Sequence, residues 1–115
     1  MKLPNLERAV VRPEKISDYL LSATHPAGRY KARFFGQFGF SRATPETLTQ
    51  SFIGHARSNE VTTVEQTAFG TRYRIDGTLG SPDGRNPRVR VIWFIDSGGD
   101  IPNLVTAYPL PELKT

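Results

Sequence analysis

Hydrophobic positions repeat with a helical period in the first half of the chain. Pro13 suits the first turn of a helix, because it has no amide hydrogen to leave unpaired there, and the apolar spacing after it continues to about Ser22. A second helix is expected from about Arg29 to Gln37, ending near Gly39. Each of these helices should turn one face toward a core.

A third helix has the most distinct start. Thr44 is expected as its N-cap and Pro45 as its first helical residue, while Leu48 and Phe52 lie on its apolar face. The helix should end near Ser58.

From about residue 60 the apolar period changes to two, and the segments become rich in β-branched and aromatic residues. The turn sequences at 81–84 and 97–100 are short, so the strands that they join should be antiparallel, because parallel strands need long crossovers. Residues 6–11 are also apolar enough for a short strand. The main strands are expected at 60–67, 70–79, 88–96 and 103–108.

These elements predict a single α+β domain over residues 1–115, with three N-terminal helices packed on a four-stranded antiparallel meander sheet. The absence of cysteine excludes disulfides and thiolate metal sites. No apolar run approaches the roughly 18 residues that cross a bilayer, and the first residues lack the apolar stretch of a signal peptide. We therefore expect a cytoplasmic protein without a membrane partner, although a toxin delivered by a larger carrier has the same features.

The net charge of +4 is unevenly distributed. Residues 1–58 contain nine Lys or Arg against four Asp or Glu, whereas residues 59–115 contain six against seven. No acidic residue lies between Asp18 and Glu46. Such a basic region favours phosphate-bearing partners, although an ordinary solvated helix surface is an equal alternative.

The second predicted helix carries a lysine in an aromatic face. A rotation of about 100° per residue places Lys31 between Phe38 and Phe35. An unpaired buried ammonium is costly, so we expect the Lys31 head to emerge in a cleft where it meets an anion; a lysine snorkelling at the edge of the face is the alternative. Tyr30 falls on the same apolar face, and the opposite face displays Arg29, Arg33 and Gln37.

His25 lies in the loop before this helix, six residues before Lys31. Imidazole is the side chain best suited to proton transfer near neutral pH, so His25 is a candidate acid or base in the same cleft; a surface or capping histidine is the alternative. His55, on the third helix beside Phe52, is expected to be structural.

The alternation of the strands predicts a basic outer face of the sheet. If Tyr73 and Trp93 face the helices, the opposite face displays arginines around an aromatic ring, which suits single-stranded nucleic acid. Ordinary cross-strand pairs of arginine with acid are the alternative. The residues on this face are Arg72, Arg74, Arg88, Arg90 and Phe94, with Thr106 and Tyr108 sharing a face on the last strand.

Several common chemistries lack their signatures. The chain has no glycine-rich phosphate loop and no nucleophile elbow. The eleven carboxylates are scattered, and neither histidine stands at metal-ligand spacing from a second ligand. We therefore expect no metal and no other cofactor.

Short motifs occur along almost the whole chain: YLLS at 19–22, HPAG at 25–28, KARFF at 31–35, FGFS at 38–41, FGTRY at 69–73, PDGR at 82–85 and VTAYP at 105–109. Together they resemble a small uncharacterised bacterial family, a resemblance that implies no particular activity. The shorter pattern from His25 to Ala32 is similar to patterns in toxins of the barnase, EndoU, colicin and RelE-like ribonuclease superfold.

That remote resemblance implies N-terminal helices before a four-stranded antiparallel sheet, and a ribonuclease that forms a cyclic phosphate. Carried over residue by residue, it marks His25 and Lys31 as catalytic, with Arg72 and Thr106 as further candidates. Such folds use different catalytic sets, so the resemblance does not fix their roles. The residues expected to bind nucleic acid are Arg29, Arg33, Arg74, Arg88, Arg90 and Tyr108.

The resulting hypothesis is a metal-independent, toxin-like endoribonuclease that cleaves tRNA or mRNA through attack by a 2′-hydroxyl. It implies RNA as a partner, together with a small cognate antitoxin or immunity protein. One alternative is a non-catalytic interaction module, such as an antitoxin or an inactive relative of the nuclease fold. Another is a small-ligand pocket between helices and sheet, lined by Tyr19, Phe35 and Trp93.

Overall fold

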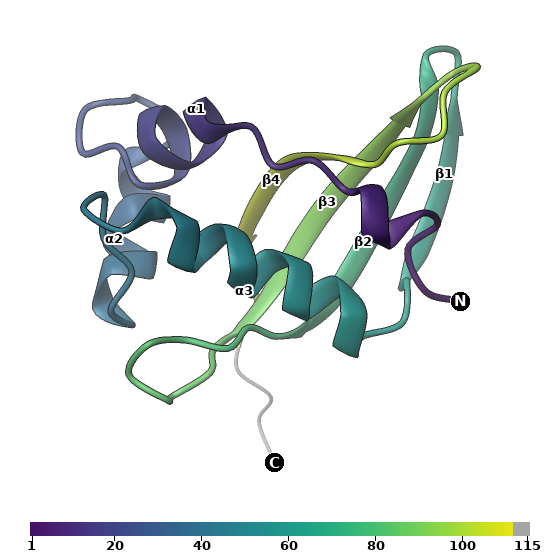
Figure 1. Cartoon of the computed structure of the whole chain (residues 1–115). Coiled ribbons are helices and arrows are strands. Elements are labelled where there is room, and N and C mark those ends of the chain that lie inside the picture. The colour runs from purple at the N-terminus through teal and green to yellow at the C-terminus, as the bar shows by residue number, and fades with distance from the viewer. Residues whose placement is uncertain (112–115) are drawn as a thin grey trace.

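The computed structural model describes residues 1–111. Helical segments precede a four-stranded antiparallel sheet, so the predicted α+β architecture is confirmed (Figure 1). The elements in chain order are the 3-10 turn η1 (Leu6–Arg8), α1 (Pro13–Lys15), the π-helical turn η2 (Ile16–Leu20), α2 (Arg29–Gln37), α3 (Pro45–Ser58), β1 (Thr63–Thr67), β2 (Gly70–Thr78), β3 (Arg88–Asp96) and β4 (Asn103–Pro109).

The sheet is a meander in the order β1-β2-β3-β4. One row of the register runs from Arg74 on β2 through Ile92 on β3 to Thr106 on β4, and a bulge follows Ile92. β3 has its predicted bounds, while β1 starts at Thr63, three residues later than expected. The delay arises because the Val61 amide donates to the carbonyl of Met1 at 2.7 Å, so the N-terminus occupies this part of the segment.

The short strand predicted at residues 6–11 is wrong. Leu6–Arg8 form a 3-10 turn, and only Val10 pairs with the sheet, in a single parallel bridge to Asn103. The Val10 amide donates to the carbonyl of Pro102 at 2.9 Å, and Val10 accepts from the Leu104 amide at 3.0 Å. The N-terminal segment therefore runs along the β4 edge, as Figure 1 shows.

Two details of the helices also differ from the prediction. The first helix widens after Lys15 into a π turn, in which the Leu21 amide donates to the carbonyl of Ile16 at 2.8 Å, and it ends before Ser22. Helices α2 and α3 have their expected bounds, but the Thr44 side chain makes no capping hydrogen bond. The Thr44 carbonyl instead accepts from the amide of Thr47 at 3.1 Å.

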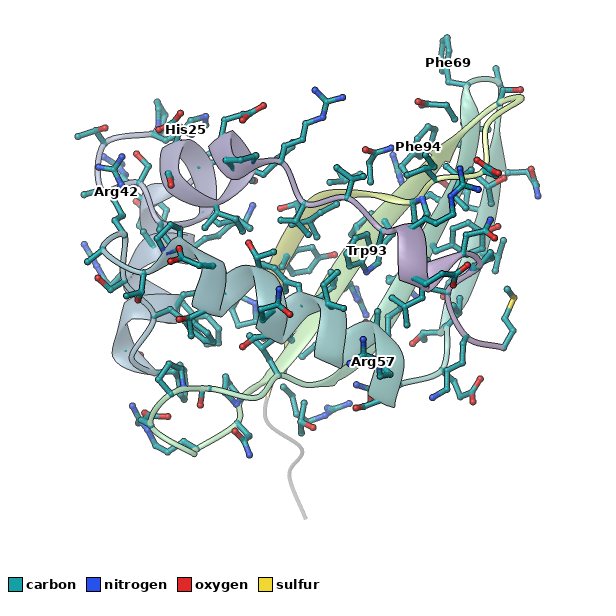
Figure 2. All side chains as sticks on the ribbon, in the orientation of Figure 1. His25, Arg42, Arg57, Phe69, Trp93 and Phe94 are labelled. Atoms are coloured by element: carbon teal, nitrogen blue, oxygen red, sulfur yellow. The ribbon has the colours of Figure 1, made fainter. Side chains whose placement is uncertain are left out.

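The core lies between α3 and the sheet, where Figure 2 shows Trp93. Phe35 of α2 packs edge-on against Phe52 of α3, with ring centroids 5.9 Å apart. Phe35 and Trp93 are completely buried, so the pocket that the small-ligand alternative expected between them and Tyr19 is not open at these two residues. Tyr30 was expected on the apolar face of α2 but is 62% exposed.

His55 is buried in the core, as expected for a structural residue. It is 2% exposed, and neither ring nitrogen has a hydrogen-bond partner among residues 1–111. Burial lowers the pKa of His55, against the opposing influence of the Val89 and Gly77 backbone and of the Asp76 charge. Within the described part of the chain, no helix is long and apolar enough to cross a membrane.

Candidate active site around Tyr19

The side chain of Tyr19 connects the residues that the sequence singled out. Lys31 Nζ donates a hydrogen bond to the Tyr19 hydroxyl, which also shares one with Thr106 Oγ1 at 3.1 Å. The Tyr19 ring packs edge-on against the His25 ring, with centroids 5.0 Å apart. We call Tyr19, His25, Lys31 and Thr106 the tyrosine cluster. Their elements are η2, the following loop, α2 and β4.

The loop that carries His25 is folded tightly against Tyr19. Ser22 Oγ accepts the backbone amide of His25 at 3.1 Å, which closes the first part of the loop. Gly28 then lies so close to Tyr19 that a Cβ atom there would come within 2.0 Å of the Tyr19 carbonyl oxygen. Only glycine fits this contact, and it places the start of α2, and thereby Lys31, beside η2.

The surroundings of the Tyr19 hydroxyl favour its ionised form. Partial burial raises the pKa of Tyr19, but hydrogen bonds to Lys31 and Thr106 and the charges of Lys31 and Lys15 outweigh it. The net result is a pKa below the ordinary value of 10.0. Lys15 Nζ lies 5.6 Å from the centroid of the Tyr19 ring. A phenol with a lowered pKa next to ammonium groups is suited to proton transfer.

His25 is held in one tautomer by backbone hydrogen bonds. Its Nδ1 atom accepts the amide of Ala27 at 3.0 Å and the amide of Gly28 at 3.1 Å. Because an accepting nitrogen carries a lone pair, the ring proton of neutral His25 lies on Nε2. This geometry suits a hydrogen-bond donor better than the acid or base that the sequence predicted.

A surface hollow of about 420 Å³ opens beside the cluster. Tyr19 and His25 line it, whereas Lys31, whose ammonium is bound to the Tyr19 hydroxyl, is not among its lining residues. The sequence predicted that Lys31 and His25 share one cleft; in the structure each contacts Tyr19, and His25 but not Lys31 lines this hollow. The remaining lining residues have mixed charge: Arg12, Glu14, Lys15 and Asp18.

The basic residues around Tyr19 differ in their pairing from those on the sheet. Among residues 1–111, Arg12, Lys15 and Lys31 have no carboxylate within 4.0 Å, whereas Asp18 pairs with Arg42 at 3.6 Å. Lys31 is bound to the Tyr19 hydroxyl, whereas Arg12 and Lys15 line the hollow and keep their charge available to a phosphate group.

Most arginines on the outer face of the sheet are occupied. Arg90 binds Asp76 through two hydrogen bonds of 2.8 and 2.9 Å, which are the main cause of the lowered pKa of Asp76. Arg72 pairs with Glu65 at 3.2 Å. Arg74 donates to the hydroxyl of Thr63 at 2.7 Å. The arginines do share one face, as expected, but in-sheet partners hold three of them, and two of these contacts are the arginine–acid pairs that the alternative predicted.

The predicted site residues thus divide into two groups. His25, Lys31 and Thr106 come together, whereas Arg72 lies on β2, separated from β4 by β3. Outside the cluster, Arg29 and Arg33 are exposed on α2, and Arg88 and Phe94 are half-buried on β3. Tyr108 lies on β4, with its ring centroid 5.8 Å from Cζ of Arg90.

Sequence reasoning named Tyr19 only as a lining residue of the small-ligand alternative and not as a candidate for catalysis, because its helical spacing is that of an apolar face. The available signal was Lys15, which stands four residues earlier and therefore next to Tyr19 on a helix.

The model of a domain of unknown function (DUF6883) matches residues 2–111. The chain belongs to the DUF6883 family. The expected membership of an uncharacterised family is thereby confirmed. No curated protein and no solved structure matches the chain. The resemblance to ribonucleases thus has no support from these comparisons and remains a prediction. Among the described residues of this DUF6883 chain, no three His, Asp or Glu side chains are grouped as metal ligands would be.

Proposed function

We propose that this DUF6883 chain is an endoribonuclease that cleaves RNA by attack of a 2′-hydroxyl at the tyrosine cluster. The observation that supports it most is the Tyr19 hydroxyl, which is bound by the Lys31 ammonium and has a lowered pKa beside a partly basic hollow. The chemistry needs a group that accepts the 2′-hydroxyl proton and cations that stabilise the charge on the phosphate. Tyr19 supplies the first, and Arg12 and Lys15, which line the hollow, supply the second.

Each residue has a role that follows from its hydrogen bonds. The deprotonated form of Tyr19, whose share the lowered pKa increases, accepts the 2′-hydroxyl proton, and the freed 2′-oxygen bonds to phosphorus. The bond from phosphorus to the 5′-oxygen breaks, and that oxygen takes a proton from Lys15, which leaves a 2′,3′-cyclic phosphate. Lys31 stabilises the Tyr19 anion, and the Nε2–H of His25 donates to a phosphate oxygen. Thr106 orients the Tyr19 hydroxyl.

The test is cleavage of a single-stranded RNA by the purified chain, with the products analysed for a cyclic phosphate. Tyr19→Phe should reduce cleavage at least 100-fold, the range typical of a lost proton-transfer group. Tyr30→Phe is the matched control, because this exposed tyrosine lies outside the cluster and should leave the rate unchanged. Equal rates for Tyr19→Phe and the wild type would contradict the proposal.

The second candidate is an RNA-binding module without catalysis. The observation that favours it is the backbone capping of His25 Nδ1, which removes the histidine from proton transfer. In that case the wild-type chain retains RNA in a salt-sensitive manner and leaves it intact.

An active ribonuclease of this kind would act on tRNA or mRNA in the cytosol of the cell that it poisons. A cell that makes it needs a neutralising protein, and an acidic surface on that protein would complement the cations around Tyr19. Expression of the wild-type chain should then arrest growth, while expression of Tyr19→Phe should not.

A further inference from the structure

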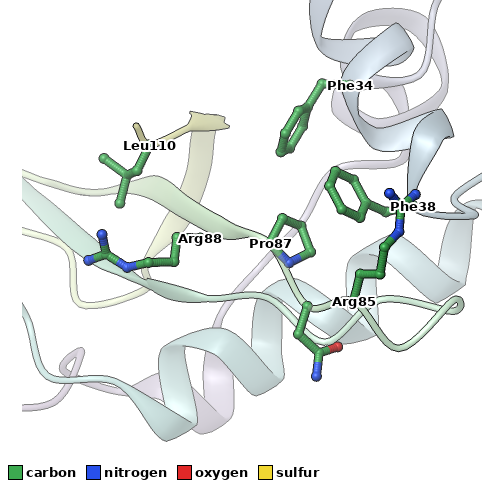
Figure 3. Close-up of a pocket in the computed structure, with 7 residues that line it drawn as sticks. Phe34, Phe38, Arg85, Pro87, Arg88 and Leu110 are labelled. Atoms are coloured by element: carbon green, nitrogen blue, oxygen red, sulfur yellow. The ribbon is translucent and has the colours of Figure 1, made fainter. Parts of the chain in front are cut away.

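A second pocket, of about 490 Å³, lies between α2 and the segment that leads into β3. Figure 3 shows the rings of Phe34 and Phe38 on one side of it, with Pro87 and Arg88 on the other and Leu110 closing one end. We call this site the phenylalanine pocket. Its wall is aromatic and aliphatic, with arginines at its rim; the remaining lining residues are Arg85 and Asn86.

The two arginines of this pocket are held differently. The Arg85 guanidinium stacks on Phe38 at 4.5 Å from the ring centroid, and it pairs with Asp83 at 2.6 Å. It also donates to the backbone carbonyl of Gln37, so its position is fixed. Arg88 is half-buried, and its guanidinium has no hydrogen-bond or carboxylate partner within residues 1–111. Arg88 is therefore available to an anion in the pocket.

The phenylalanine pocket and the tyrosine cluster draw residues from the same two parts of the fold, α2 and β4 with its continuation. On α2, Phe34 and Phe38 follow Lys31 by three and seven residues, which places all three on one side of the helix. On β4 and its continuation, Thr106 and Leu110 are four residues apart on the same face, a distance of about 13 Å at roughly 3.3 Å per residue. Both sites thus lie along the boundary between α2 and β4.

We propose that the phenylalanine pocket binds a base of single-stranded RNA, with an adjacent phosphate on Arg88, while the scissile phosphate lies at the tyrosine cluster. The position of the scissile phosphate at the tyrosine cluster rests on the proposed function, whereas the binding of a base in the pocket does not. Aromatic rings offer a stacking surface to any base, and an unpaired guanidinium offers two donors to a phosphate. An acidic peptide would use the arginine but would leave the two rings without a planar partner.

The experiment measures binding of a fluorescently labelled, 2′-O-methylated single-stranded oligonucleotide by anisotropy. This probe has no free 2′-hydroxyl, so it is not cleaved. Phe34→Leu should weaken binding about tenfold, in the range of a lost base stack. Arg88→Gln should weaken binding and lower the slope of log K against log salt by about 0.7, the value for one phosphate contact on a single strand.

The matched control is Arg57→Gln, which removes the same charge from the exposed end of α3, seen in Figure 2, and should leave binding near the wild-type value. Wild-type affinity in both Phe34→Leu and Arg88→Gln would overturn the pocket proposal. So would a wild-type chain that does not bind the probe, or one that binds labelled polyglutamate equally well.

Different results would contradict the active-site proposal and the pocket proposal. If Tyr19→Phe cleaves RNA like the wild type while the Phe34 and Arg88 variants lose affinity, the pocket stands and the catalytic assignment falls. If Tyr19→Phe loses cleavage while the pocket variants keep full affinity for the probe, the pocket proposal falls and the active site stands.

Discussion

The hydroxyl of Tyr19 differs from an ordinary tyrosine hydroxyl because an ammonium group and a second hydroxyl both contact it. By contrast, the ring of Tyr30 is 62% exposed on α2. Single residues with special surroundings are found in the core as well, where His55 has two ring nitrogens without partners among the described residues. Both environments lead to measurable titration behaviour.

The pKa of Tyr19 should depend on Lys31. Replacing Lys31 by Met removes a hydrogen bond and a positive charge, which are two of the causes that lower this pKa, so the pKa should rise toward 10.0. The chain has four tyrosines, so the titration of Tyr19 is obtained from their total phenolate absorbance. The absorbance of a Tyr19→Phe variant is subtracted at each pH. An unchanged difference titration in Lys31→Met would show that the ammonium does not act on the phenol.

The stability of the fold should fall in mildly acidic solution because of His55. The unfolded chain binds a proton at His55 near pH 6.5, whereas burial lowers the pKa in the folded chain. The unfolded state thus binds more protons just below pH 6.5, and the free energy of unfolding decreases as the pH falls. Asp76 acts only at more acidic pH, since its pKa is lowered from 3.8.

The His55→Leu variant tests whether His55 causes this loss of stability at mildly acidic pH. The variant lacks the titrating group and two unpaired polar atoms, so it should be about as stable as the wild type near neutral pH and lose less stability on acidification. Urea unfolding at several pH values measures both. Parallel pH profiles for variant and wild type would contradict the assignment.

The candidate site could be predicted only in part from single residues. Lys31 was recognisable because an ammonium in an aromatic face is unusual, and His25 because it lies near Lys31 in the chain. Tyr19 was not, since a tyrosine at core spacing looks like any other apolar residue until its hydroxyl has partners. Those partners are provided by α2 and β4, which local spacing does not relate to η2.

At the scale of elements, the predicted bounds agree best with the structure where apolar residues repeat regularly along the segment. α2, α3 and β3 have the expected bounds, because many apolar residues repeat along each of them. The strand predicted at residues 6–11 is wrong, since the structure has a turn at Leu6–Arg8 and a single bridge from Val10 to Asn103 there. The loop between η2 and α2 has no period, and its shape depends on the contact of Gly28 with Tyr19.

Gly28→Ala should therefore disrupt the tyrosine cluster. A Cβ atom at this position would lie 2.0 Å from the Tyr19 carbonyl oxygen, so the loop or η2 must move. We expect a loss of about 1–3 kcal/mol in the free energy of unfolding. The pKa of Tyr19 should return toward 10.0 as Lys31 is displaced. Thermal unfolding and the tyrosine titration measure the two effects.

Gly36→Ala is the matched control, since nothing lies within 4 Å of a Cβ there. It replaces a glycine within α2 and should stabilise the chain by roughly 0.5–1 kcal/mol. Equal effects of the two substitutions would show that the close contact of the loop with Tyr19 is unimportant.

At the scale of the whole molecule, both proposed sites carry cations that have no carboxylate partner within residues 1–111. Arg12 and Lys15 line the hollow beside Tyr19, and Arg88 lines the phenylalanine pocket. The sheet arginines are largely neutralised by Glu65 and Asp76 or occupied by Thr63, and these pairings depend on strand register that no spacing rule gives.

RNA binding should reflect this difference between paired and unpaired cations. Lys15→Gln should lower the slope of log K against log salt by about 0.7, because it removes one phosphate contact. Arg72→Gln removes a charge already paired with Glu65, so the slope should remain within error of the wild type. Anisotropy titrations at several salt concentrations give both slopes. A larger slope change for Arg72→Gln would place the RNA on the sheet face.

The hydrogen bond between Tyr19 and Thr106 joins positions 87 residues apart. During translation, η2 leaves the ribosome long before β4 has been synthesised. A nascent chain therefore lacks one partner of the Tyr19 hydroxyl, and the β4 side of the site, until almost all of residues 1–111 have emerged. The site that we propose for RNA cleavage is therefore complete only after β4 has docked beside η2.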